Sequence, residues 1–296
     1  MGKLHRPSSA PGQAAIVIVL LFAAGCAVIP PTGDRKEPAT MPSSASQPHQ
    51  PSLRDLGSHP WTVVEEGVTR GDPSHQRMAL IFTGGDHGEG TGHILDTLAR
   101  HRIRSSFFFT GDYLRKPAHA DFLKRILAEG HYLGPHSDAH PLYVPWEDRS
   151  KTLVSEAFFK QDLQKNIDDL RKLGALKDVT QPVYFIPPYE WYNRDQSRWA
   201  REMGVLLFNF TPGSGSNRDW APEGHKSFVP STKIIADVLA YEEKDPHGLN
   251  GFLLLLHVGS QRQDKTFLLL DDLLTELKAR GYEFTRVDEL LAVKSE

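Results

Sequence analysis

The sequence predicts an α/β fold in which a parallel sheet closes, or nearly closes, into a (β/α) barrel. Short apolar runs alternate with stretches of helical periodicity along most of the chain, and this order is typical of parallel strands connected by helices. Two of the runs, Met78–Phe82 and Gly251–His257, are apolar without alternation, as expected of strands buried on both faces. So many strand–helix repeats favour a barrel over an open sheet.

Each predicted element rests on its own local pattern. Strands are expected at residues 78–82, 106–110, 131–133, 183–186, 205–210 and 251–257. Helices are expected at residues 94–101, 121–129, 155–173, 195–203, 231–243 and 266–280. Glu156 and Gln161 supply early polar groups to the third helix, and Ser231 is the expected N-cap of the fifth.

Residues 1–26 resemble a secretory signal. A cationic start is followed by the apolar run Ala14–Ala24, which falls short of the ~20 residues that span a bilayer. Cys26 is the only cysteine, so no intramolecular disulfide is possible. Its place after Ala-Ala-Gly resembles a bacterial lipobox, which implies cleavage before Cys26, lipidation of its sulfur and, with Ala27 next, delivery to the outer membrane. The alternative is an ordinary signal peptide.

The rest of the chain divides into a tether and one domain. Residues 27–58 are rich in Pro, Ser, Gln and Thr and almost lack large apolar side chains, so a flexible tether is expected. Residues 59–296 suit one large α/β domain. The net charge of −3 at pH 7 gives no reason to expect a nucleic-acid partner.

Side chains suited to a functional site follow four of the predicted strands, at Thr83–Glu89, His136–His140, Pro187–Asn193 and His257. In (β/α) barrels the working residues lie where strands end and loops begin. His136 and His140 are spaced at i and i+4, which allows two ring nitrogens to reach one metal ion. Two imidazoles with an oxygen ligand suit one divalent ion; zinc is expected, with Co²⁺, Ni²⁺ or Fe²⁺ able to substitute.

These motifs, in this order, resemble the NodB-type polysaccharide deacetylases of carbohydrate esterase family 4, over residues 76–291. The matching segments are His136-Ser-Asp-Ala-His140, Pro187-Pro-Tyr189 and Leu255-Leu-His257. The resemblance implies a distorted (β/α) barrel of the NodB-homology type, an Asp-His-His metal site and hydrolysis of N- or O-acetyl groups on a carbohydrate. It also implies that His136 and His140 are metal ligands and that His257 is the general acid.

The chain departs from the family where the base belongs. Thr83 and Gly84 stand where the family has two adjacent aspartates, one the base and the other a metal ligand. Ile186 stands where the family has an arginine that orients the base. The joint loss of base and arginine, with both histidines kept, indicates a coordinated rearrangement of the site.

Three carboxylates are candidates to compensate. Asp86, in a glycine-rich loop two residues beyond the usual ligand position, is the candidate third ligand, or else an Asx-turn residue. Glu89 of the same loop is a candidate base or ligand, and Glu190 is a candidate base. His87 is a further candidate ligand, or an exposed loop residue.

Aromatic residues near the predicted mouth suit a carbohydrate. Tyr189, Trp191, Tyr192 and Trp220 offer flat apolar faces on which sugar rings stack, or else they pack as ordinary core and rim residues. The leading hypothesis is therefore an atypical metal-dependent hydrolase that removes acetyl groups from a carbohydrate. Two alternatives stay open: a non-catalytic carbohydrate-binding lipoprotein, and a hydrolase acting on another amide, ester or glycosidic bond.

Overall fold

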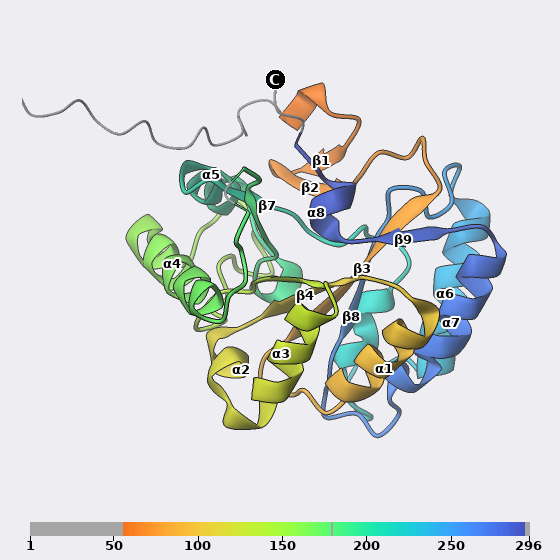
Figure 1. Cartoon of the computed structure of the whole chain (residues 1–296). Coiled ribbons are helices and arrows are strands. Elements are labelled where there is room, and N and C mark those ends of the chain that lie inside the picture. The colour runs from red at the N-terminus through yellow and green to blue at the C-terminus, as the bar shows by residue number, and fades with distance from the viewer. Residues whose placement is uncertain (1–55, 179, 294–296) are drawn as a thin grey trace, which may run out of the picture. The chain divides into compact units, whose positions relative to one another are not determined.

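The computed structural model describes residues 56–178 and 180–293, which belong to one unit of the chain (Figure 1). The predicted signal segment 1–26, with Cys26, and most of the predicted tether lie outside the described residues. Leu56 is buried against the core and begins a 3-10 turn, Leu56–Ser58. The folded part therefore includes residues that the tether prediction had assigned to the linker.

The predicted strands and helices occur in the predicted order, with short additional elements before and between them. The strands are β1 Thr62–Val64, β2 Gly67–Arg70, β3 Arg77–Gly84, β4 Ser106–Phe109, β5 Tyr132–Pro135, β6 Val183–Phe185, β7 Val205–Leu207, β8 Leu253–His257 and β9 Glu283–Thr285. The helices are α1 Thr91–His101, α2 Gly111–Arg115, α3 Ala120–Ala128, α4 Glu156–Lys172, α5 Arg194–Glu202, α6 Ser231–Lys244, α7 Leu270–Ala279 and α8 Val287–Leu290. Short 3-10 turns, η2 Pro117–His119, η3 Pro188–Glu190, η4 Ser216–Trp220 and η5 Thr266–Leu269, complete the set.

The strands form a barrel with incomplete closure. One parallel sheet has the order β5-β4-β3-β8, with β9 also paired to β3, and β6 and β7 form a separate parallel pair. Between β5 and β6 the Tyr184 backbone N–H donates to the side-chain hydroxyl of Tyr132 at 2.9 Å, and not to a backbone carbonyl of β5. A single bridge, Val68 to Phe208, joins β2 to the end of β7. This is the distorted barrel that the sequence predicts.

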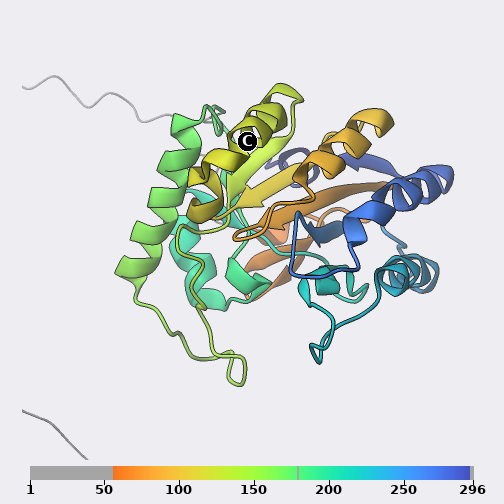
Figure 2. The same cartoon turned by 90° about the horizontal axis from the view of Figure 1, so that it is seen from below.

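The central strand β3 shows how the sequence produces two packed layers. Met78, Leu80 and Phe82 pack against the helices outside the sheet, including α1, α3 and α7. Ala79 and Ile81, which point the opposite way, pack inside the barrel with side chains of β2, β6, β7 and β8. Both faces of β3 are thus buried, which is why its apolar run does not alternate. Seen from below, the gold, olive and blue helices α1, α3 and α7 cover one side of the sheet (Figure 2).

Three local predictions need correction. The N-cap of α6 is Pro230, and Ser231 is the first helical residue, with its hydroxyl 2.8 Å from that of Thr266. The segment predicted as one helix at 266–280 is a 3-10 turn followed by α7. The strand predicted at 205–210 ends at Leu207, because Phe208 leaves the pair to meet Val68.

The short elements β1, β2, β9, α2 and α8 were not predicted, since runs of three to five residues carry too little periodicity. No helix in the described ranges combines the length and the apolar character needed to cross a membrane.

Candidate active site

The predicted strand ends meet at one cleft of about 890 Å³. Its wall includes the ends of β3 and β8, the residues that directly follow β4 and β5, and the turns η3 and η4, because parallel strands present their carboxyl ends at one edge of a barrel. The predicted residues that line it are Asp86, His87, His136, His140, Tyr189, Glu190, Trp220 and His257. Glu89, Trp191 and Tyr192 are not among the lining residues.

The backbone at this edge is unusual. Ser137, His140, Tyr189 and Glu190 all have positive φ, and they make up half of the eight non-glycine residues with positive φ in the described chain. Such conformations are sterically costly for residues with a side chain and concentrate at functional sites. Here they turn His140 and Glu190 into the cleft immediately after β5 and β6.

The two histidines after β5 form a neutral pair. The His136 Nδ1–H donates to the Ile186 carbonyl at 2.9 Å, which leaves the Nε2 lone pair facing the cleft. The centroids of the His136 and His140 rings lie 4.9 Å apart. Burial, with the neighbouring histidines, holds the pKa of His136 well below its usual value, and burial and the charge of His257 lower the pKa of His140 to about 4. Both rings therefore carry lone pairs near neutral pH.

Glu190 is a buried carboxyl that faces the histidines. Its side chain is only 9% exposed, and its Oε1 lies 3.9 Å from the His136 Nε2. Burial raises its pKa to about 7; the charge of His257 opposes this rise and that of Asp219 adds to it. A carboxyl group that ionises near neutral pH is suited to accept a proton during a reaction.

His257, at the end of β8, is oriented by a carboxylate that the sequence did not reveal. Asp219 of η4 accepts both the His257 Nδ1–H at 2.6 Å and the His257 backbone N–H at 2.8 Å. Burial alone would lower the pKa of His257, but the charge and hydrogen bond of Asp219, with the charge of Glu190, outweigh it and raise the pKa. The protonated ring can therefore present its other N–H to the cleft.

The β3 end has lost the space for a carboxylate as well as the carboxylate itself. A Cβ at Gly84 would lie 2.5 Å from Cγ2 of Val258 and 3.0 Å from the Phe109 ring. Any side chain there would require repacking, at a typical cost of 1–3 kcal/mol. Thr83 is 1% exposed, and its hydroxyl has no hydrogen-bond partner among the described residues.

The loop after β3 separates its two predicted acids. Glu89 accepts from Lys265 at 2.5 Å and from the Ser260 amide at 3.0 Å, so it fastens this loop to the segment after β8. Glu89, predicted as a base or ligand, is therefore held by these two contacts and is not among the residues that line the cleft. Asp86 is exposed at the rim of the cleft, where the Lys116 ammonium donates to its carbonyl at 2.8 Å.

Some of the predicted aromatic residues line the cleft and others support the fold. Tyr189 is 45% exposed, lines the cleft, and lies with its ring centroid 4.5 Å from that of His140. Tyr192 is completely buried, and its hydroxyl donates to the Val64 carbonyl, so it supports the fold and does not reach a ligand in the cleft. Trp191 stacks beneath Trp146, an exposed cleft residue that the sequence analysis missed.

The donor types at the cleft fit a divalent ion, but the described residues do not gather three ligating side chains within reach of one. The neutral imidazoles of His136 and His140 are suitable donors. Asp86, predicted as the third ligand, stands apart because its loop is held at the rim, although its charge is close enough to raise the pKa of His140. Asp138 is neutralised by Arg115 and Lys165 and is not available as a ligand.

Comparisons with known proteins agree with this architecture. The family model described as polysaccharide deacetylase matches residues 70–208. A peptidoglycan-N-acetylglucosamine deacetylase of Listeria monocytogenes is 29% identical over 225 residues, which are 75% of this chain and 40% of that protein.

Two solved structures share the fold. The structure of a family 4 carbohydrate esterase from Bacillus subtilis has a TM-score of 0.60 at 22% identity, covering 77% of this chain and 85% of that one. A family 4 pseudoenzyme from Bacillus anthracis has a TM-score of 0.60 at 20% identity, covering 79% and 72%. Residues 70–208 thus match the polysaccharide deacetylase family, and the chain is similar to a deacetylase over most of its length.

Proposed function

We propose that the protein is a metal-dependent hydrolase that removes acetyl groups from N-acetylated sugars of a glycan. The observation that carries the proposal is the arrangement of Glu190, His257 and Asp219 around one cleft, opposite a neutral histidine pair. This arrangement offers an acid and a base even though Thr83 and Gly84 occupy the family's usual positions. The Listeria relative, named a peptidoglycan deacetylase, supports an N-acetylated sugar polymer as the substrate class.

In the proposed reaction Glu190 and His257 divide the proton transfers. Glu190, ionised, takes a proton from the water that attacks the acetyl carbon. His257, protonated and held by Asp219, gives a proton to the sugar nitrogen as the carbon–nitrogen bond breaks, which releases acetate and an amine. The pKa of about 7 at Glu190 and the raised pKa at His257 allow both required forms to coexist near neutral pH.

His136 and His140 would hold the metal ion, with Asp86 as the proposed third ligand and zinc as the expected metal. Family members are generally metal-dependent. A bound zinc ion would polarise the acetyl oxygen and lower the pKa of a bound water. Asp86→Ala should weaken zinc affinity, whereas Glu190→Gln should leave zinc stoichiometric. If Glu190→Gln loses zinc and Asp86→Ala keeps it, the roles of the two acids are reversed.

The test of the function is acetate release. The zinc-loaded protein should release acetate from N-acetylated oligosaccharides or peptidoglycan fragments, and His257→Ala should lower the rate by about 10²-fold or more. Near-full activity in His257→Ala with zinc still bound would refute the assignment of the acid.

A second candidate is a glycan-binding protein without activity. It is favoured by the packing of Val258 against Gly84, which closes the usual ligand position, and by the fold shared with a pseudoenzyme. This candidate predicts glycan binding with no acetate from any acetylated substrate.

We also propose that the mature protein is a lipoprotein anchored through Cys26 in the outer membrane. The lone cysteine behind an apolar run and small residues supports this proposal.

A further inference from the structure

We infer that Trp146 is the platform of a second sugar subsite, which binds the C–H face of a sugar adjacent to the one that carries the acetyl group. The inference rests on the proposed function for the chemical class of the ligand, an oligosaccharide of N-acetylhexosamine units. Trp146 lies in the long connection between β5 and α4 and lines the same cleft as the histidine pair.

The first observation is exposure at the cleft. The Trp146 side chain is 58% exposed, a large fraction for an indole ring that lines a cleft. Leaving a large aromatic ring in water forgoes the free energy that its burial would provide. A flat apolar face of this kind is suited to the C–H face of a pyranose ring, and aromatic side chains provide large contact areas at ligand sites.

The second observation is that the ring is held from behind. Trp146 stacks on Trp191 with centroids 5.9 Å apart and an interplanar angle of 27°. The Arg149 guanidinium lies 4.6 Å from the Trp191 ring centroid and 5.1 Å from that of Tyr192, so it is held between them. The Trp191 indole N–H donates to the Pro145 carbonyl at 3.3 Å. One side of Trp146 is therefore backed by a continuous stack, while more than half of the residue's surface stays exposed to solvent.

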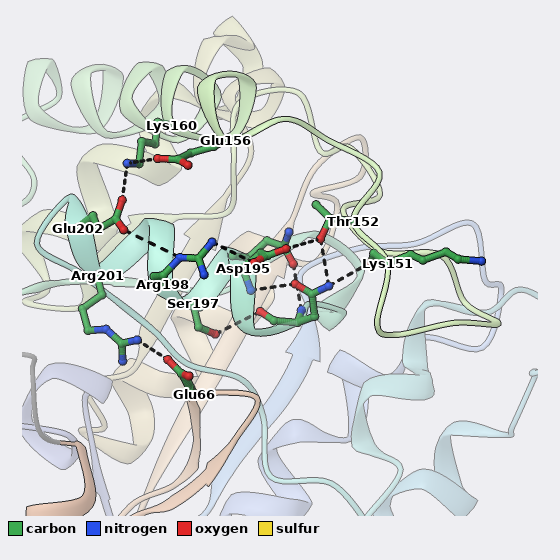
Figure 3. A network of polar contacts seen from close by, with 12 residues as sticks. Glu66, Lys151, Thr152, Glu156, Lys160, Asp195, Ser197, Arg198, Arg201 and Glu202 are labelled. Atoms are coloured by element: carbon green, nitrogen blue, oxygen red, sulfur yellow. Dashed lines mark hydrogen bonds and ion pairs between the residues drawn. The ribbon is translucent and has the colours of Figure 1, made fainter.

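The third observation is that the connection carrying Trp146 is anchored to α5. Asn193, the N-cap of α5, donates to the carbonyls of Arg149 and Lys151 at 3.1 and 3.0 Å. The Thr152 hydroxyl donates to Asp195 at 2.9 Å, and Figure 3 shows Thr152 and Lys151 of the connection beside Asp195. A platform fixed before binding loses little conformational freedom when the sugar arrives, which favours affinity.

The position of the platform identifies which sugar it binds. Trp146 meets Tyr189 edge to face, with centroids 5.9 Å apart, and Tyr189 in turn lies 4.5 Å from His140. The Trp146 ring is thus one aromatic residue removed from the histidine pair. A sugar stacked on it would be a neighbour of the reacting unit, so a single sugar could not occupy both places.

The experiment measures how binding affinity depends on the number of sugar units in the ligand. N-acetylglucosamine and its β-1,4-linked dimer and tetramer are titrated into the zinc-loaded full chain carrying Glu190→Gln, which prevents turnover. The tetramer should bind more tightly than the monomer, and adding Trp146→Ala should weaken tetramer binding about three- to tenfold, as expected for one aromatic contact. Trp146→Phe should restore most of the loss.

The matched control is Phe158→Ala, because Phe158 is an exposed aromatic residue of α4, 42% exposed, that does not line the cleft. It should retain the full gain from monomer to tetramer. Equal tetramer affinity with and without Trp146→Ala would overturn the subsite. If the wild type also releases acetate, equal tetramer affinity would overturn the subsite and leave the proposed function standing. Tetramer binding that depends on Trp146, without acetate release by the wild type, would uphold the subsite and refute the proposed function.

Discussion

Replacing Glu190 by Gln should stabilise the metal-free protein. This stabilisation should appear only above the pH at which Glu190 ionises in the unfolded chain. Gln keeps the size and shape of the side chain and removes its charge. The side chain is 9% exposed, so solvent screens its charge little. A rise of the pKa from the ordinary 4.5 to about 7 corresponds to about 3 kcal/mol of unfavourable free energy for holding the ionised form in the folded protein.

The sign follows from proton binding in the two states. Between pH 4.5 and about 7 the folded protein keeps the Glu190 proton that the unfolded chain has lost. The free energy of unfolding therefore falls as pH rises through this window, and the loss is complete above it. Glu190→Gln lacks this loss, so its advantage over the wild type should be smallest below pH 4.5 and approach about 3 kcal/mol at pH 8.

Denaturant unfolding at a series of pH values, with a chelator present, measures the difference directly. Glu147→Gln is the control, because Glu147 is exposed, and its curve should follow that of the wild type. A Glu190→Gln advantage that is the same at pH 4 and pH 8 would show that Glu190 is not held in a raised-pKa environment, and its role as base would lose its physical basis.

Three further outcomes are expected. His136→Ala and His140→Ala should each abolish stoichiometric zinc by elemental analysis, and retention of zinc by both would place the metal elsewhere. Asp219→Asn should move the basic limb of the pH–rate profile to lower pH and lower kcat by about 10²-fold, because burial would then lower the pKa of His257 with only the charge of Glu190 to oppose it; an unmoved limb would contradict this. Cys26→Ser should leave the protein unprocessed or released from membranes, whereas unchanged detergent-phase partitioning would refute lipid anchoring.

The longer strands and the positions of the site residues at strand ends were predictable, because both depend on local sequence pattern. The apolar run at Met78–Phe82 predicted β3, and the rule that barrel sites lie at strand ends predicted that His136, Glu190 and His257 would share a cleft. Short elements such as β9 were not predictable, because three residues at the edge of a sheet have no distinctive period.

The remaining features of the site depend on long-range packing. Asp219 lies in a 3-10 turn 38 residues from His257, and nothing in its surroundings in the sequence links the two. The only available signal was chemical: a histidine acting as an acid needs a partner that fixes its ring. Likewise, the sequence offered both Asp86 and Glu89 of one loop as candidates, and only long-range contacts, those of Glu89 with Lys265 and Ser260, show that Glu89 is held away from the cleft.

One comparison tests the proposed replacement of the missing aspartate by Glu190 as the base. Zinc content and acetate release from an N-acetylated oligosaccharide are measured together for the wild type and for Glu190→Gln. Equal zinc content and a fall in acetate release of about 10²- to 10⁴-fold are expected in the variant. Equal rates of acetate release, with zinc bound in both proteins, would contradict this replacement.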